Sequence, residues 1–174
     1  KQGQKVAAKR SDREAKEGLV IAQTNSDNTK GYIVTISCET DFVSKNADFI
    51  AFAKSIADAA VANDVSSAEA LNETEVNGAK VADLINDKLA AIGEKIGVAR
   101  FEKIEAPYVS AYIHGAYRIG VLVGLNKENA EAVKDIAMQI AALNPLAVDA
   151  DSITPDVVER ERDVIVEKRK ADPK

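Results

Sequence analysis

The sequence predicts an α+β fold with antiparallel sheets, packed helices and a C-terminal helix. Short segments with alternating apolar residues indicate strands, and longer segments with apolar residues at helical spacing indicate helices. These segments lie in separate blocks, which favours α+β architecture over a parallel sheet. One unit, a β-hairpin followed by a helix, also occurs twice in the 174 residues. The fold is therefore expected to contain a duplicated unit.

The first copy of the unit runs from residue 19 to about residue 60. Strands are predicted over 19–24 and 31–38, and the polar turn 25–28 joins them. Asn46 or Asp48 can cap the following helix because each carries a side-chain oxygen that accepts from free backbone amides. The apolar face expected for this helix consists of Phe49, Phe52, Ala53, Ile56, Ala57 and Ala60.

The second copy repeats this order. A strand is predicted over 108–113, His114-Gly115 marks the turn, and alternating apolar residues over 119–123 predict the second strand. The helix that follows has the same apolar spacing as the first, with Val133, Ile136, Ala137, Ile140 and Ala141. Shared order, turn placement and strand phase favour a true repeat over two unrelated amphipathic helices.

The remaining segments surround the second copy. Residues 63–77 are polar, 78–94 are expected to form a helix, and 98–106 alternate enough for a strand. Thr154-Pro155-Asp156 combines a capping hydroxyl, a proline for the first helical position and an acid, which predicts a helix over 155–169. Its apolar pairs repeat every seven residues, so it packs either on another helix or on its own domain.

The connection after residue 38 is unusual because it holds two large apolar residues. Asp41-Phe42-Val43 lies at a strand-to-helix corner, whereas the second copy has the polar Asn126-Lys127-Glu128 there. The fold unit itself therefore does not need hydrophobes at this position. One interpretation places Phe42 and Val43 in a hydrophobic staple or the core. The other, which we expect, leaves both exposed for a partner.

The same stretch resembles the central motif of the translation elongation factor Ts family. The resemblance begins at Thr35-Ile36-Ser37-Cys38 and continues through Glu39-Thr40-Asp41-Phe42-Val43-Ser44-Lys45, with Thr35 and Ser37 as departures from the usual residues. It extends over roughly residues 5–168, through 112–115, 118–123 and 135–142.

The resemblance implies a guanine-nucleotide exchange factor that binds elongation factor Tu, in GDP-bound and nucleotide-free form, and displaces magnesium and GDP. It implies a cytoplasmic protein that supports translation and needs no cofactor. The residues implied for the primary contact are Thr40, Asp41, Phe42 and Val43. Those implied for a second contact are His114, Met138, Asn144 and Pro145. Many members carry histidine where this chain has Asp135 and Gln139, so contacts through those two side chains are not carried over to this chain.

Four parts are expected along the chain. They are a basic linker over 1–17, an N-terminal core subdomain over 18–106, a C-terminal core subdomain over 107–150 and a C-terminal helix over 151–174. The resemblance implies a fragment that lacks an N-terminal helical domain and stops within a protruding helical hairpin. In some members that hairpin serves dimerisation, so a homodimer through the C-terminal helical region is a further expectation.

Composition excludes several classes of function. A net charge of −5 argues against broad binding to nucleic-acid phosphates. No apolar run reaches the roughly 20 residues of a membrane span, and nine scattered glycines form no phosphate loop. No cluster of Cys and His has metal-ligand spacing. The lone Cys38 fits a reducing cytosol.

Two rival functions stay open from the residues alone. The first is a non-catalytic structural or chaperone-like binding module in which Phe42 belongs to the core. The second is a small thiol enzyme that uses Cys38 with His114, the only histidine. Cys38 shares its strand phase with Val34 and Ile36, so we expect it to be buried and inert. The chain is accordingly not expected to be an enzyme.

Overall fold

The computed structural model describes residues 13–171, which form two compact units that divide between Ala142 and Leu143. The elements of the first unit are β1 (Glu17–Thr24), β2 (Lys30–Cys38), α2 (Asp41–Ser44), α3 (Ala47–Ala62), α4 (Ala68–Glu73), β3 (Glu75–Val76), β4 (Ala79–Lys80), α5 (Val81–Ile92), β5 (Gly97–Glu105), β6 (Tyr108–His114), β7 (Ile119–Leu125) and α6 (Ala130–Leu143, whose last residue is assigned to the second unit). The second unit holds the short 3-10 helix η1 (Ala150–Ser152) and α7 (Pro155–Ala171).

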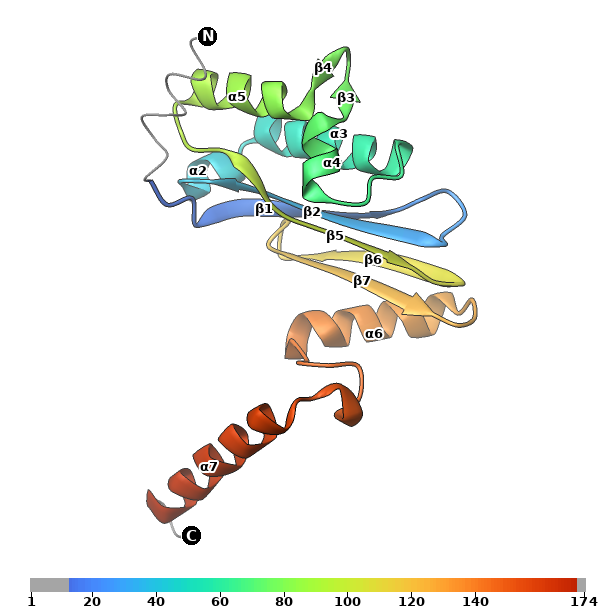
Figure 1. Cartoon of the computed structure of the whole chain (residues 1–174), viewed down its shortest axis with the longest axis vertical. Coiled ribbons are helices and arrows are strands. Elements are labelled where there is room, and N and C mark those ends of the chain that lie inside the picture. Colours follow the sequence, from blue (N-terminus) through green and yellow to red (C-terminus); the bar gives the residue numbers. More distant parts are fainter. Residues whose placement is uncertain (1–12, 172–174) are drawn as a thin grey trace. The chain divides into compact units, whose positions relative to one another are not determined.

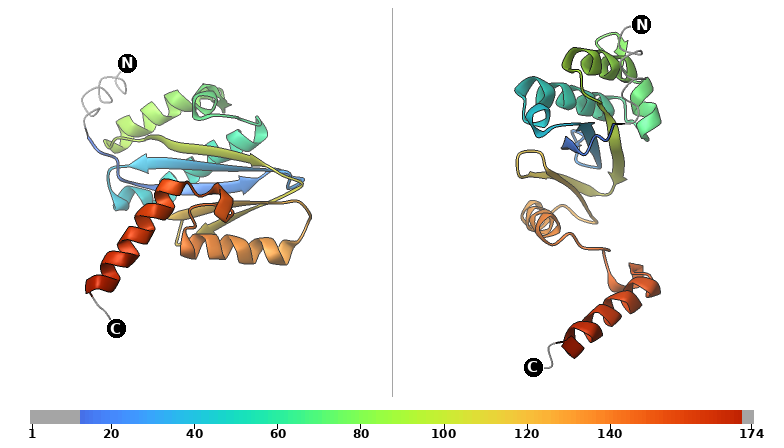
Figure 2. Two further views of the ribbon diagram at one scale, coloured as in Figure 1. Left: turned by 60° about the horizontal axis from the view of Figure 1, so that its bottom comes forward. Right: turned by 90° about the vertical axis from the view of Figure 1, so that its left-hand side faces the viewer.

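The first unit is built in layers (Figure 1). Strands β1, β2 and β5 form an antiparallel sheet with β2 in the centre. Helices α3, α4 and α5 cover one face of this sheet, and the antiparallel hairpin β6–β7 lies against the other. Helix α6 packs on the far side of that hairpin (Figures 1 and 2). Each β-hairpin therefore packs against the helix that follows it in the chain, and the two hairpins pack against each other through their opposite faces.

Alternation along the strands explains these layers. Leu19 and Ile21 of β1 are buried in the core beneath α3, whereas Val20 between them points to the opposite face and meets the second hairpin. The two hairpins approach closely because glycines stand at the contact. A Cβ added at Gly120 would lie 2.7 Å from Val20, and one added at Gly31 would lie 2.7 Å from Val109. Larger residues at either glycine would push the hairpins apart.

Two apolar clusters hold the first unit together. The larger lies between the three-stranded sheet and its helices, and its fully enclosed members include Val34, Ile36, Cys38, Phe49, Ile56 and Leu71. The smaller joins the second hairpin to α6 through Val121, Val123, Val133 and Ala137. Ile136, expected on the buried face of α6, is instead exposed, because this smaller layer packs on one side only and leaves that position in solvent.

The sequence places the helix ends through local chemistry. The Asn46 side chain accepts from the backbone amides of Asp48 and Phe49 and so caps α3, and Ser67 caps α4 in the same way. Gly93 ends α5 in the left-handed conformation. Asp64 follows α3 and Asn144 follows α6, both with positive φ. The two repeated helices therefore stop with a similar backbone turn.

The α+β class is confirmed, with small antiparallel sheets and a C-terminal helix. The predicted strands and the two long repeated helices all form close to the expected bounds. The region 63–80 differs, because the expected polar stretch contains α4 and the β3–β4 hairpin, so α5 begins at Val81. Asn77-Gly78 turns this hairpin with two positive φ angles, as Asn-Gly pairs favour. Most of the predicted linker 1–17 lies outside the described residues.

The second unit is small and leaves much apolar surface open. Helix α7 begins after Thr154, whose carbonyl accepts from the amides of Val157 and Val158, as the start signal predicted. None of its described residues is buried. Large exposed apolar side chains of this unit are Leu143, Leu146, Val148, Val158, Val164, Ile165 and Val166. An amphipathic helix this open is not enclosed by its own unit.

Candidate functional site

Phe42 is exposed on a single helical turn between β2 and α3. Its side chain is 84% accessible to solvent, which confirms the expectation for this residue and contradicts the interpretation that buries it. Phe49, seven residues later on α3, is 1% accessible. The chain thus encloses one phenyl ring and leaves the other exposed to solvent.

Val43 differs from the expectation that it is exposed with Phe42. It is partly buried and packs against the larger core cluster. The reason is the geometry of α2, where neighbouring residues point about 100° apart around the helix axis. One side chain of the pair therefore anchors the turn to the core while the other points to solvent. Val43 supports the site from beneath.

Glu94 holds the chain immediately before Phe42. Its carboxylate Oε2 accepts from the backbone amides of Glu39 and Thr40, both at 3.0 Å, and its Oε1 accepts from the Thr40 hydroxyl at 2.6 Å. Thr40 is the N-cap residue of α2, yet its side chain makes no capping bond within the helix. The hydroxyl is instead committed to Glu94. Three donors of residues 39–40 therefore converge on one side chain.

The Glu39 side chain adds a second link between the same two segments, this time with the accepting carboxylate on the segment that precedes α2. Its Oε1 accepts from the backbone amide of Lys95 at 2.6 Å, and its Oε2 pairs with Arg13 at 3.0 Å. Lys95 in turn donates from Nζ to the carbonyl of Arg13 at 3.0 Å. The end of β2, the segment after α5 and residue 13 are thereby joined into one polar frame. Phe42 projects from this frame.

Asp41 is charged and paired in the free chain. Lys45, one turn later, donates to its Oδ2 at 2.7 Å, and this hydrogen bond and charge lower the pKa of the Asp41 carboxyl. The pair is exposed, so solvent screens it. Asp41 thus offers a carboxylate beside the exposed ring at neutral pH.

The connection in the second copy is shorter and has no helix. Residues 39–46 join β2 to α3, whereas residues 126–129 join β7 to α6 directly. The likeness is therefore between two connections and does not hold residue by residue. The whole turn α2, and not only its hydrophobes, belongs to the first copy alone.

A nucleophilic pair of Cys38 and His114 is not assembled. Cys38 is fully buried under α3 and donates to the Thr40 carbonyl at 3.2 Å. Burial, with the negative charges of Glu94 and Glu17, raises the pKa of its thiol to about 11. His114 is exposed, and its Nδ1 lies 2.9 Å from the Tyr112 hydroxyl. The predicted burial of Cys38 is confirmed, and a thiol with this pKa is protonated at neutral pH.

The residues expected for a second contact lie on separate elements. His114 ends β6, Met138 is exposed on α6, and Asn144 and Pro145 follow the end of that helix. All four reach solvent. Asn144 adopts φ of 45° and, with Pro145, ends the helix, as proline after a helix does. Their use by a partner stays a prediction.

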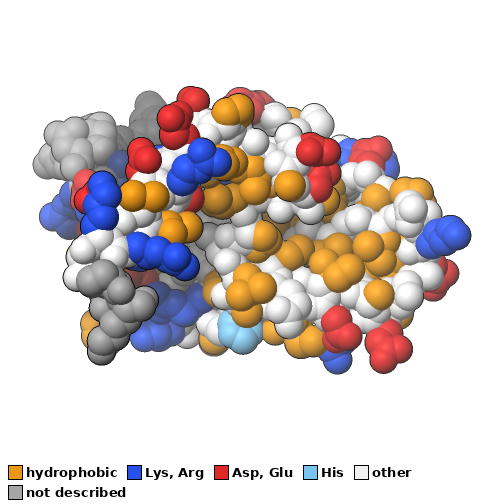
Figure 3. Space-filling model, turned by 90° about the horizontal axis from the view of Figure 1, so that it is seen from below, with side chains coloured by type: hydrophobic (Ala, Val, Ile, Leu, Met, Phe, Trp, Pro, Cys, Tyr) orange, Lys and Arg blue, Asp and Glu red, His pale blue; other side chains and the backbone are white. Residues whose placement is uncertain are grey.

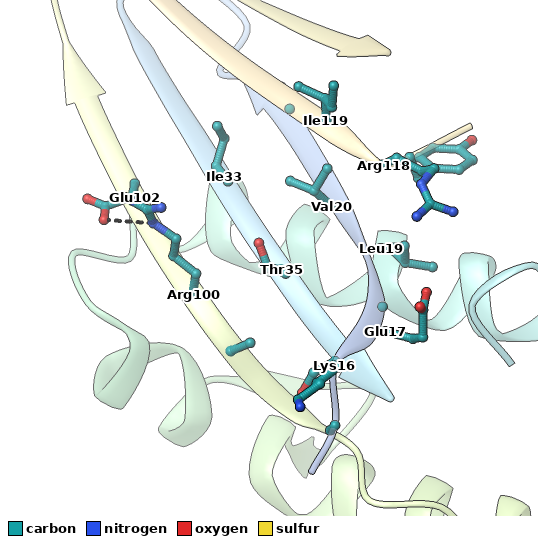
Figure 4. Close-up of a pocket in the computed structure, with 16 residues that line it drawn as sticks. Lys16, Glu17, Leu19, Val20, Ile33, Thr35, Arg100, Glu102, Arg118 and Ile119 are labelled. Atoms are coloured by element: carbon teal, nitrogen blue, oxygen red, sulfur yellow. Dashed lines mark hydrogen bonds and ion pairs between the residues drawn. The ribbon is translucent and has the colours of Figure 1, made fainter. Parts of the chain in front are cut away.

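A depression of about 590 Å³ lies on the sheet face that the second hairpin covers only in part (Figure 4). Thr35 and Ile33 of β2 form part of its floor, and Arg100 with Glu102 of β5 and Lys16 stand along it. None of the predicted site residues lines it. Its cations alternate with acids, as in the 3.3 Å pair of Arg100 and Glu102, so it concentrates no single charge.

Between residues 13 and 171, no three His, Cys, Asp or Glu side chains stand close enough together to hold a metal ion. No helix over the same span combines the length and apolar character that crossing a bilayer needs. The exposed ring of Phe42 with its polar frame remains the candidate site.

The sequence motif predicts Thr40, Asp41 and Phe42 as site residues but gives no indication of Glu94. The motif signals the first three because they stand together in the chain. Glu94 reaches Thr40 across 54 residues, and a glutamate after a helix-ending glycine has no local pattern that points to the corner. Only the pairing of β5 with β2 brings the two segments together.

The described residues thus form an α+β scaffold with an exposed phenyl ring, that of Phe42, on a braced turn. Comparison with known proteins gives the particular family. A family model described as elongation factor TS matches residues 39–174. The chain belongs to the elongation factor Ts family.

Individual relatives agree with this assignment. An elongation factor Ts of Christiangramia forsetii is 44% identical over 94% of this chain and 60% of its own length. Those of Flavobacterium psychrophilum and Phocaeicola vulgatus are 37% and 42% identical, over 100% and 98% of this chain and 64% and 51% of their own lengths. The chain thus spans between half and two thirds of these curated relatives.

Proposed function

We propose that this chain is a guanine-nucleotide exchange factor that binds elongation factor Tu and accelerates release of GDP during translation elongation. The observation that carries the proposal is Phe42, 84% exposed on a turn that the polar frame holds in place. Membership of the elongation factor Ts family supplies the partner. The structural alternative required Phe42 inside the core, which is the opposite of its observed position.

Exchange of this kind needs no covalent chemistry. A protein that binds the nucleotide-free partner more tightly than the GDP-bound partner weakens GDP binding by the same factor. A thousandfold effect requires about 4 kcal/mol of differential binding. Burying one phenyl side chain supplies about 1.5–3 kcal/mol. Phe42 is therefore the largest single contribution that we assign, and further contact surface must add to it.

The residues have separate roles in the proposal. Phe42 inserts between helices of the partner's nucleotide-binding domain. Asp41 places a carboxylate near the magnesium ion that holds the phosphates, and Lys45 releases it on binding. Val43 anchors α2 to the core so that insertion does not unwind the turn. Displacement of magnesium then loosens GDP.

The second contact is assigned to the exposed residues of the second copy and of the segment after it. Met138 is a flexible apolar side chain on the outside of α6, a type often used at binding surfaces. His114 of the first unit, and separately Asn144 and Pro145 at the start of the second, are further residues proposed to contact the partner. In this proposal the two copies have different roles, because the first copy carries the inserting Phe42 and the second extends the contact area.

The C-terminal unit is assigned to self-association. Apolar side chains of α7 are exposed. The same unit has a groove of about 460 Å³, and the apolar residues that line it include Leu146, Ile153, Val157 and Ile165. Figure 3 shows hydrophobic side chains among charged ones on the face it displays. A second copy of α7 would cover such a stripe, so we propose a homodimer. The proposed setting is the cytoplasm, where translation occurs, without direct contact to nucleic acid or membrane.

The test is release of fluorescent GDP from elongation factor Tu, with and without this chain. We expect the chain to accelerate release and Phe42→Ala to reduce the exchange efficiency about tenfold to a hundredfold. Asp41→Asn keeps the shape and removes the charge, so a smaller loss is expected. Val148→Ala serves as the control, because Val148 is also a fully solvent-exposed hydrophobe and is not among the residues proposed to contact elongation factor Tu.

Two outcomes would overturn the proposal. One is a chain that binds elongation factor Tu without changing the rate of GDP release, which would leave a non-catalytic binding module. The other is an equal loss for Phe42→Ala and Val148→Ala, which would show that the exposed ring has no special part. Sedimentation equilibrium over a range of concentrations tests the homodimer separately.

A further inference from the structure

Glu94 stands in an unusual position for a residue with no assigned role. It follows the helix-ending Gly93 and is only partly exposed, yet it accepts three hydrogen bonds from a segment far away in the chain. All three donors belong to Glu39 and Thr40, the two residues directly before α2. Glu94 touches neither Phe42 nor Asp41 by any of these bonds. Whatever it does for the site acts through the backbone.

We propose that Glu94 is the positioning residue of the exchange site and fixes the direction in which α2 presents Phe42. The inference rests on the proposed function and extends it to a residue that the motif does not include. Glu94 clamps the entry of the turn, while Val43 anchors the turn itself to the core. The ring then projects from a turn fixed at two points.

The physical reason is the entropy of a short connection. A single helical turn has too few internal hydrogen bonds to be stable by itself. Fixing the backbone of one residue costs roughly 1–2 kcal/mol at 25 °C. If Glu39 and Thr40 were free in solution, that cost would fall on the binding step and weaken the complex. Glu94 fixes both residues when the chain folds, so the entropy cost falls on folding and not on binding. This is preorganisation.

The choice of a carboxylate follows from the donors. The two backbone amides and the hydroxyl all donate here, and an ionised carboxylate accepts on both oxygens. Bonds from neutral donors to a charged acceptor are also stronger than those between neutral groups. Glutamine can still accept from both amides through its single oxygen and can donate to the Thr40 hydroxyl oxygen. Alanine removes every contact, which separates the two variants.

The experiment compares Glu94→Ala, Glu94→Gln and wild type in GDP release from elongation factor Tu. We expect Glu94→Ala to lower the exchange efficiency about tenfold, equal to about 1.4 kcal/mol, and Glu94→Gln to retain most of it. Glu128→Ala, an exposed glutamate in the connection of the second copy, controls for loss of one negative charge and should match wild type.

Amide hydrogen exchange in the free chain gives a readout that does not depend on the partner. The amides of Glu39 and Thr40 should exchange at least tenfold faster in Glu94→Ala, while amides in the centre of α3 keep their protection. Thr40→Val, which removes only the hydroxyl, should give an intermediate effect. It also keeps the test decisive if Glu94→Ala does not fold.

The possible failures are distinguishable. If wild type does not accelerate GDP release, the proposed function fails, and amide exchange still decides whether Glu94 holds the turn. If wild type is active and Glu94→Ala and Thr40→Val are as active as wild type, the positioning role is overturned. Equal losses for Glu94→Ala and Glu94→Gln would overturn it as well, since they would assign the effect to the charge. Unchanged exchange of the Glu39 and Thr40 amides in both variants would also contradict the clamp.

Discussion

The two copies of the hairpin-and-helix unit differ most where strand passes into helix. The first copy uses residues 39–46, forms the turn α2 and exposes Phe42, whereas the second passes from β7 to α6 through the polar residues 126–129. Both copies have the same strand order and similar helix ends. The short connection is sufficient for the fold. The extra length of the first connection is where Phe42 is exposed.

The comparison extends to the support beneath each connection. In the first copy, Glu94 and Glu39 link the connection to the segment after α5 by hydrogen bonds. That segment belongs to the region between the copies, which has no counterpart after α6 in the first unit. An exposed hydrophobe together with an added brace indicates a surface that is both presented and held still.

The largest expected effect separates the two phenylalanines of the first copy. Phe49→Ala should lower the free energy of unfolding by about 3–5 kcal/mol, because it removes a ring from a closed core. Phe42→Ala should change it by less than about 0.5 kcal/mol, as for an exposed side chain. Urea unfolding of both variants measures the contrast. Similar losses at the two positions would mean that Phe42 is buried in solution.

A smaller effect is expected when the first connection takes the residues of the second. The triple variant Asp41→Asn, Phe42→Lys, Val43→Glu should reduce GDP-release efficiency about a hundredfold, or about 2.7 kcal/mol. Its unfolding free energy should fall by about 1 kcal/mol, since Val43 packs on the core. Restoring Val43 alone should recover stability without recovering exchange. Recovery of exchange by Val43 would remove Phe42 from its central role.

Much of the fold was accessible from the sequence because local signals agree with the tertiary structure. Alternation in β1 and β2, the Asn46 cap and the apolar spacing of α3 and α6 all act over a few residues. The region 63–80 was mispredicted because its helix has only six residues and its strands two each. Elements this short carry too little periodicity to detect, although Asn77-Gly78 marks a hairpin turn.

The candidate site was only partly accessible for a different reason. The exposure of Phe42 follows from comparing the two connections, which the sequence permits. The opposite behaviour of Val43 depends on the single turn of α2, and no pattern over four residues fixes which side faces the core. Glu94 depends on a contact across the sheet. Local chemistry thus predicts which residues form the site better than how they are held.

A modest effect on the unfolding free energy is expected from substitution of Asp64, which follows the first repeated helix, α3. Asp64 accepts from the Tyr32 hydroxyl at 2.6 Å and from Lys103 at 2.7 Å, and it also pairs with Lys30. The hydrogen bonds from Lys103, Lys30 and Tyr32 hold the pKa of Asp64 well below its ordinary value of about 4. The positive-φ residue that follows α6 is the neutral Asn144.

The lowered pKa of Asp64 means that the contribution of its ion pairs to the unfolding free energy depends on pH in a defined direction. A carboxyl with a depressed pKa in the folded state stabilises the protein above its unfolded pKa, and this stability is lost as the pH falls toward the folded pKa. Wild type should therefore exceed Asp64→Asn in unfolding free energy by a constant amount above about pH 5, and the gap should narrow below about pH 4. Asparagine keeps the left-handed backbone, which makes it a clean control. Urea unfolding at several pH values measures the gap, and a gap that widens in acid would contradict the assignment.

The smallest expected effect comes from adding a hydrophobe to the second connection. Lys127→Phe places a phenyl ring where the second copy is polar, and the exposed position should tolerate it within about 0.5 kcal/mol. Combined with Phe42→Ala, it should leave GDP release as slow as in Phe42→Ala alone. The reason is that residues 126–129 form no helical turn and have no counterpart of the Glu94 clamp to orient a ring. The measurement is GDP release by the double variant beside both single variants, with urea unfolding to show that all three fold. Full recovery of exchange would mean that any exposed ring on this scaffold suffices, and the difference between the two connections would then be one of sequence alone. Continued loss would show that the turn and its brace are as necessary as the ring.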